Sequence, residues 1–170
     1  MHKLLSLLCF FVLTFAHAQP PALELTPRGF EPVQVTIPAT PNEKLIEISR
    51  AWAAGMKRNN KGVDVTDVNE NAMTISAFKK NAFFIRNKGE MFEYTIRYSM
   101  KLNFYNTYYT MQFIVSDIYT DVDVLVKYKL PDYFNAEGNL KEGYADLKPS
   151  LERTVNELSA SYYEFIVNYR

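Results

Sequence analysis

Residues 92–104 alternate between apolar and polar side chains without a break, and this pattern constrains the fold more than any other feature of the sequence. The even positions are apolar and the odd ones polar: Phe92, Tyr94, Ile96, Tyr98, Met100, Leu102 and Phe104 alternate with Glu93, Thr95, Arg97, Ser99, Lys101 and Asn103. A period of two is typical of a β-strand with one buried face and is incompatible with a helix. At about 3.4 Å per residue the strand would extend about 40 Å, so we predict a strongly twisted, curved sheet.

Shorter alternating stretches predict the neighbours of this strand. They span residues 33–37, 63–66, 73–77, 108–116 and 122–130, which gives an antiparallel sheet of about five or six strands.

Whether the core positions of two neighbouring strands are even- or odd-numbered determines the length of the turn between them. The long strand has an even-numbered core set and the next strand an odd-numbered one, so an even loop must join them, either Tyr105-Asn106 or Tyr105 to Tyr108. Asn106 is the residue there that best tolerates positive φ. Two odd-numbered core sets flank residues 69–71, which predicts an odd loop with Asn71 in the left-handed region.

Two amphipathic helices are expected, one before and one after the strands. Thr40 can cap the first helix, Pro41 suits its first position, and Leu45, Ile48 and Trp52 follow at helical spacing. Residues 59–62 are expected to end this helix, because they include residues that tolerate positive φ. The second helix follows Pro149 and carries apolar residues spaced by threes and fours.

Each predicted strand has one apolar and one polar face, so helices should cover only one side of the sheet. We therefore predict a two-layer α+β domain in which both helices lie on one face and the opposite, polar face is free.

The two ends of the chain differ from this pattern. Residues 1–18 combine a basic start, an apolar middle and an Ala16-x-Ala18 finish, which predicts a signal peptide cleaved after Ala18 and a periplasmic or secreted protein. Residues 19–32 contain four prolines and predict a flexible leader. Residues 33–170 are then a single domain.

Cleavage would also restrict the chemistry. Both histidines (His2 and His17) and the only cysteine (Cys9) lie in the segment to be removed. The mature chain would contain neither imidazole nor thiol, which excludes disulfides, Ser-His and Cys-His catalysis and the usual zinc sites. We expect no cofactor.

Charge and hydropathy exclude two further classes. The 19 basic and 19 acidic residues balance, so the chain lacks the cationic surface that nucleic acids require. After residue 18 no apolar run approaches about 20 residues, so we expect no transmembrane segment in the mature chain.

Three groups of charged residues offer candidate sites. Asp117, Asp121 and Asp123 offer oxygen ligands but lack the glycine and glutamate of a calcium loop, so we expect no metal. Glu90 and Glu93 could serve glycoside hydrolysis, but the cations beside them favour surface pairing. A last group, interleaved with aromatic residues, predicts a loop with buried aromatics and solvated cations: Lys79, Lys80, Arg86 and Lys88.

The free face of the long hairpin is the predicted binding surface. Its candidate residues come from both strands and combine cationic, aromatic and hydrogen-bonding side chains: Arg97, Lys101, Tyr105, Tyr108, Thr110 and Gln112.

The Trp52-bearing helix, the 63–77 hairpin and the 94–118 hairpin together resemble the bacterial domain of unknown function 4468 (DUF4468), which has a TBP-like fold. The resemblance covers about residues 30–119, and the helix after Pro149 completes the architecture. It implies a secreted or periplasmic protein with a saddle-like antiparallel sheet, and it brings no established activity. A shared fold does not fix function.

From these observations we expect an exported, non-enzymatic interaction or ligand-binding domain that uses the free sheet face, with an envelope protein or a small ligand as its partner. Two alternatives remain open. One is a carboxylate-based hydrolase acting on envelope or dietary glycans, and the other is a passive structural subunit of an envelope assembly.

Overall fold

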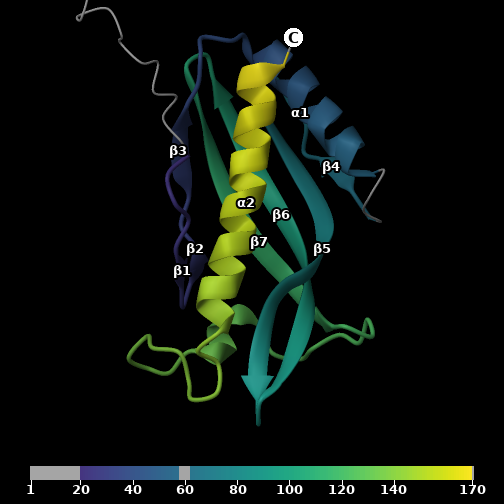
Figure 1. Ribbon diagram of the computed structural model, residues 1–170. Coiled ribbons are helices and arrows are strands. Elements are labelled where there is room, and N and C mark those ends of the chain that lie inside the picture. The colour runs from purple at the N-terminus through teal and green to yellow at the C-terminus, as the bar shows by residue number, and fades with distance from the viewer. Residues whose placement is uncertain (1–19, 58–61, 170) are drawn as a thin grey trace, which may run out of the picture.

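The computed structural model describes residues 20–57 and 62–169 as two helices packed on one face of an antiparallel sheet (Figure 1). The five strands of this sheet lie in the order β3-β7-β6-β5-β4. Their bounds are Val33–Thr36 (β3), Asp64–Thr66 (β4), Ala72–Asn87 (β5), Glu90–Tyr105 (β6) and Tyr108–Thr120 (β7). The helices are Asn42–Lys57 (α1) and Leu147–Asn168 (α2). The predicted two-layer α+β architecture is thus confirmed, while the predicted signal peptide lies outside the described residues.

The long alternating strand is β6, and its pattern holds over most of its length. The even-numbered side chains from Ile96 to Phe104 are buried. Tyr94 is only half-buried and Phe92 is 45% exposed, contrary to the expectation of an inward set that begins at residue 92. The reason is visible in Figure 1, where the tip of the β5–β6 hairpin extends beyond the lower end of α2.

The turn between β6 and β7 has the predicted even length. Tyr105 pairs with Tyr108, so Asn106 and Thr107 form a two-residue loop. Neither loop residue has positive φ, contrary to the expectation for Asn106. Their carbonyls accept hydrogen bonds from the backbone N–H groups of Thr40 and Ile37, at 2.8 and 2.9 Å. The chain between β3 and α1 therefore holds the turn in place.

The β4–β5 loop also has its predicted odd length, since Val65 pairs with Ile75. The left-handed residue is Asp67, with φ of 52°, and not Asn71 as expected. Asn71 instead donates its backbone N–H to the side chain of Asn69 at 3.0 Å. The local side-chain acceptor removes the need for a left-handed residue at that position.

The segment predicted as a loop of aromatics and cations is a strand. β5 continues through Asn87, and a two-residue turn of Lys88 and Gly89 follows, with φ of 51° and 86°. Positive φ at both central residues is typical of a type I′ turn, which suits the twist of a two-stranded hairpin. A bulge interrupts the alternation of side chains that would have predicted this hairpin from the sequence.

The bulge lies between Lys79 and Phe83, where the three residues 80–82 of β5 lie opposite one residue of β6, Thr95. Asn81 takes a left-handed conformation there, with φ of 50°. The displaced backbone bonds to α2: the hydroxyl of Thr154 donates to the Ala82 carbonyl at 2.7 Å, and the Phe84 N–H donates to Ser150 at 3.3 Å. The bulge thus fixes α2 to the sheet.

The predicted flexible leader is instead packed against the domain from Leu23 onward. It forms a two-stranded sheet of β1 (Leu25–Thr26) and β2 (Gly29–Phe30) beside α2 (Figure 1). Leu23, Leu25 and Phe30 are buried. The prolines limit local secondary structure but do not prevent the apolar residues between them from packing, so the description as a leader was wrong.

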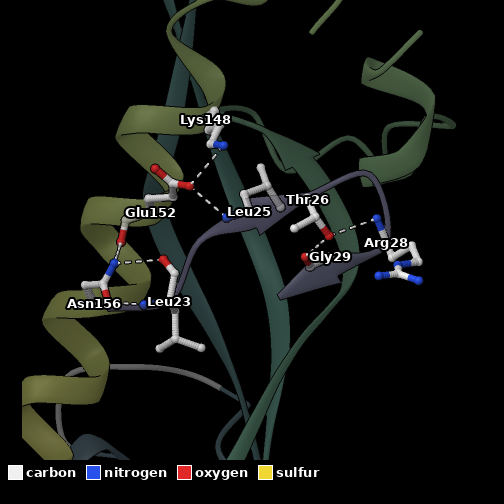
Figure 2. A network of polar contacts seen from close by, with 8 residues as sticks. All are labelled: Leu23, Leu25, Thr26, Arg28, Gly29, Lys148, Glu152 and Asn156. Carbon is white, nitrogen blue, oxygen red and sulfur yellow. Dashed lines mark hydrogen bonds and ion pairs between the residues drawn. The ribbon is translucent and has the colours of Figure 1, made fainter. Parts of the chain in front are cut away.

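Side chains of α2 hold this segment by its backbone (Figure 2). The amide of Asn156 accepts from the Leu23 N–H at 2.8 Å and donates to the Leu23 carbonyl at 3.0 Å. Glu152 accepts from the Leu25 N–H at 2.7 Å. The two residues are one helical turn apart and so reach alternate residues of an extended chain.

The strand predicted at residues 122–130 is absent. Only an isolated bridge joins Leu125 to Tyr119, and a 3-10 helix, η2 (Leu130–Tyr133), follows. The alternation of Val122, Val124 and Val126 made a strand possible, but no neighbouring strand in the described chain pairs with its outer edge. The chain therefore turns back along the end of β7 instead.

The core between helices and sheet is rich in tyrosine. Tyr162 of α2 packs edge-on against Trp52 and against Tyr109, with ring centroids 5.1 and 5.3 Å apart. Its hydroxyl lies 2.7 Å from that of Ser49 on α1. This cluster joins both helices to β7 and explains why Trp52 is buried at the middle of α1.

We predict that four buried tyrosines resist ionisation. Burial raises the pKa of Tyr98 to about 12 and the pKa values of Tyr109, Tyr133 and Tyr162 still higher. The folded state then keeps protons that the unfolded state releases near pH 10, so the stabilisation is complete below that pH and is lost as pH rises. An absorbance titration should show these phenols ionising only as near-ultraviolet circular dichroism disappears. Ionisation of all twelve tyrosines before that loss would contradict the prediction.

Candidate functional site

The free face of the sheet presents aligned rows of polar side chains. In one row Lys101 of β6 lies between its partners Thr74 of β5 and Gln112 of β7. In the next row Asn103 pairs with Thr110, and its side-chain amide donates to the Thr110 hydroxyl at 3.3 Å. Neighbouring rows are two residues apart along each strand, so these side chains project from the same face.

A groove of about 340 Å³ runs over these rows. Its walls come from four parts of the chain: the segment before β3, the β4–β5 loop, and the facing stretches of β5, β6 and β7. The lining residues are Pro32, Asp67, Asn69, Ala72, Met73, Thr74, Lys101, Leu102, Asn103, Thr110 and Gln112.

The structure brings three of the six predicted binding residues together in this groove, namely Lys101, Thr110 and Gln112. Tyr105 and Tyr108 lie at the turn of the same hairpin, where their rings stack with centroids 4.4 Å apart.

Arg97 lies toward the other end of β6, four residue pairs away from Lys101. Its guanidinium stands 5.8 Å from the ring centroid of Phe78, which also packs against Tyr119 at 5.7 Å. The predicted residues therefore lie on one face of the sheet. They form a groove at Lys101, with the stacked pair of Tyr105 and Tyr108 at one end and Arg97 beside the aromatic rings of Phe78 and Tyr119 at the other.

Sequence reasoning missed the contribution of the β4–β5 loop. Asp67 and Asn69 line the groove together with Thr74, which is buried although it is polar. Asp67 takes a left-handed conformation, which aspartate tolerates better than most residues, so its residue type was a local sequence signal for this turn. Their proximity to Gln112 depends on the strand order, which the sequence does not show.

The predicted carboxylate pair does not converge. Glu90 and Glu93 are three residues apart on one strand, so their side chains project from opposite faces of the sheet. The groove is lined by a single carboxylate, that of Asp67.

The three aspartates do not form a metal centre. Asp117 pairs with the ammonium of Lys129 at 2.8 Å, and this hydrogen bond lowers the pKa of the Asp117 carboxyl. Asp123 lies in the turn after β7, with its N–H donating to the Thr120 carbonyl at 3.1 Å. Among residues 20–57 and 62–169 no group of three or more potential ligands gathers.

The cations of β5 lie on the strand and not in a loop. The guanidinium of Arg86 pairs with Asp146 at 3.0 Å and lies 4.9 Å from the ring centroid of Phe84. Phe83 is buried and stacks on Tyr94, with ring centroids 4.9 Å apart. These contacts tie the hairpin to the start of α2 and the core, which is a structural role.

A larger groove, of about 560 Å³, lies between residues 20–22 and the second half of α2. Its lining includes Ala160, Tyr163 and Val167, together with the buried hydroxyl of Ser159. Pro20 is both part of its wall and the first described residue, so we assign no ligand to this groove.

Comparison with known proteins shows the fold. The structure matches that of a DUF4468 family protein from Bacteroides ovatus with a TM-score of 0.55 and 9% identity, over 80% of this chain and 82% of that one. It matches a TBP-like protein from Parabacteroides distasonis with a TM-score of 0.53 and 18% identity, over 82% of this chain and 93% of that one. No protein-family model and no curated protein matches the sequence. The likeness expected from the sequence is confirmed as a shared fold.

Within the described part of the chain, neither helix is both long and apolar enough to cross a membrane.

Proposed function

We propose that this protein is an exported, non-enzymatic binding domain that holds an envelope protein or a small ligand on the free face of its sheet. The observation that carries the proposal is the groove over β5, β6 and β7. There Lys101, Thr110 and Gln112 project together from a face that no described helix covers.

The chemistry of the groove defines the kind of ligand. Lys101 is exposed and pairs with no carboxylate among the described residues. An ammonium in a groove of hydroxyls and amides favours a ligand with an anionic group and several hydrogen-bonding groups. The stacked pair of Tyr105 and Tyr108 at the hairpin turn adds an aromatic surface that can contact an apolar or planar part of the ligand.

Two features favour binding over catalysis. Removal of residues 1–18 would take away both histidines and the cysteine, and the groove itself is lined by only one carboxylate. Glycoside hydrolysis usually needs two carboxyl groups that flank the bond to be broken. Export is supported by the pattern of the same N-terminal residues.

Replacing Lys101 by alanine tests the groove. We expect binding to weaken by about tenfold to a hundredfold, because a charge-assisted hydrogen bond contributes about 1.5–3 kcal/mol. The protein would be immobilised and exposed first to an envelope extract and then to purified anionic glycans. Affinity for whatever it retains would be measured by titration.

The matched control is Arg50→Ala, which removes an exposed cation from α1 on the opposite layer. It should leave the affinity unchanged, while Gln112→Ala should weaken it. Equal affinities of the wild type and the Lys101→Ala variant would contradict the assignment of the ligand to this face.

A further inference from the structure

The segment 121–129 has the pattern of a strand but lies outside the sheet. Figure 1 shows it projecting from the lower end of β7, clear of both helices. Its apolar side chains are unusually exposed: Val122 is 73%, Val124 58%, Leu125 54% and Tyr128 59% exposed. Four of the eight large exposed apolar residues of the described chain are in this segment, which is a feature of surfaces that bind a partner.

One edge of the segment is already in a strand-like arrangement. The Thr120 N–H donates to the Val124 carbonyl at 2.9 Å, and the Val126 N–H donates to the Ile118 carbonyl at 2.8 Å. Leu125 lies between these two bonds, opposite Tyr119. In an antiparallel ladder alternate residues direct their backbone groups to opposite sides. The N–H and C=O of Leu125 therefore point away from β7, where no described residue binds them.

The sequence of the segment is complementary to itself. It reads Asp-Val-Asp-Val-Leu-Val-Lys-Tyr-Lys from residue 121 to residue 129. In an antiparallel pair centred on Leu125, Asp123 lies opposite Lys127 of the second copy, and Val124 lies opposite Val126. The two inner charges, Asp123 and Lys127, then each face the opposite charge of the second copy, whereas an in-register parallel pairing would align like charges.

We propose that two copies of this chain associate by antiparallel pairing of residues 124–126 across a two-fold axis at Leu125, with Asp123 of each copy close to Lys127 of the other at the ends of the ladder. The N–H of each Leu125 donates to the C=O of Leu125 in the second copy. The two segments then join the sheets of both copies into one continuous sheet. An interface that uses the same patch on both subunits is the usual form of a homodimer. Adding a strand to an exposed sheet edge is an established mode of association.

The pairing requires little rearrangement of the described structure. Residues 124–126 already lie along β7, and Asp123 keeps its left-handed turn. Lys129 keeps its pair with Asp117, so only the inner charge pairs are needed. The association would cover part of Val124 and Leu125, which are 58% and 54% exposed in the monomer.

Sedimentation equilibrium of the full chain, purified after export, tests the proposal over a range of concentrations. We expect a monomer–dimer equilibrium. Leu125→Glu should raise the dissociation constant at least about tenfold, since each dimer then contains two facing carboxylates at its centre. Val68→Glu, at an exposed apolar residue of the β4–β5 loop, is the matched control and should leave the constant unchanged.

Charge-reversed variants test the register. Lys127→Glu and Asp123→Lys should each be monomeric, and an equimolar mixture of the two should form a heterodimer, while Lys80→Glu on β5 should dimerise normally. Thermal unfolding of each variant checks that the fold is retained. A wild-type monomer at the highest attainable concentration would overturn the proposal. So would a dimer that Leu125→Glu leaves intact, or a mixture that does not associate.

Discussion

Replacing Trp52 by alanine should lower the free energy of unfolding by about 3–5 kcal/mol. The indole is 6% exposed and packs edge-on against Tyr162 at 5.1 Å between ring centroids. Tyr162 in turn contacts Tyr109 of β7 and the hydroxyl of Ser49. Removing the indole would leave a cavity where both helices meet the sheet, and the rigid aromatic neighbours could refill it only in part.

Urea unfolding of the wild type and the variant measures this difference, and an unchanged slope would show that both unfold to similar states. Arg50→Ala is the control, because it alters the exposed face of the same helix and should change stability by less than about 0.5 kcal/mol. A Trp52→Ala variant with nearly wild-type stability would show that α1 does not pack on the sheet as described.

Replacing Leu25 by alanine should cost about 2–5 kcal/mol, the range for a large aliphatic residue in a packed core. Leu25 is 1% exposed, and its N–H donates to Glu152 of α2 at 2.7 Å. The result discriminates sharply between two views of the N-terminal segment. A mobile leader predicts no loss of stability, whereas the packed hairpin of β1 and β2 predicts a large one.

Glu24→Ala is the matched control for Leu25→Ala, since it truncates the adjacent, exposed side chain of the same strand-like segment. Its effect should stay within about 0.5 kcal/mol. Thermal or urea unfolding of both variants gives the comparison. Equal stability of the Leu25→Ala variant and the wild type would mean that residues 20–32 do not belong to the folded core.

Local periodicity predicted the layers of this domain well. Side chains alternate with a period of two at residues 96–104 and with a period near 3.6 around Trp52. These periods depend only on residues a few positions apart, and the pattern of buried side chains follows from them. The even length of the β6–β7 loop followed from the parity of the flanking core sets, although its position at Asn106 and Thr107 did not. Such inferences need no knowledge of distant parts of the chain.

The candidate site was predicted in part. The free face and its residues Lys101, Thr110 and Gln112 follow from the odd and even positions of one hairpin. The groove also needs Asp67 and Asn69 from the β4–β5 loop. Those residues reach it only because β4 and β5 pair on the far side of β6, and strand order depends on contacts that no local pattern records.

The sequence by itself determined that this chain forms an α+β sheet with one buried face, because side-chain alternation and helical spacing are local properties. Only the tertiary structure decided whether residues 20–32 pack against the domain and whether residues 122–130 form a strand. Leu23 is bound by Asn156, 133 positions away, while the valines after β7 lack a strand to pair with inside the described chain. An apolar residue is buried only where another part of the chain packs against it. Residues 20–32 pack against α2, whereas no distant part of the described chain packs against residues 122–125, and local sequence does not determine either outcome.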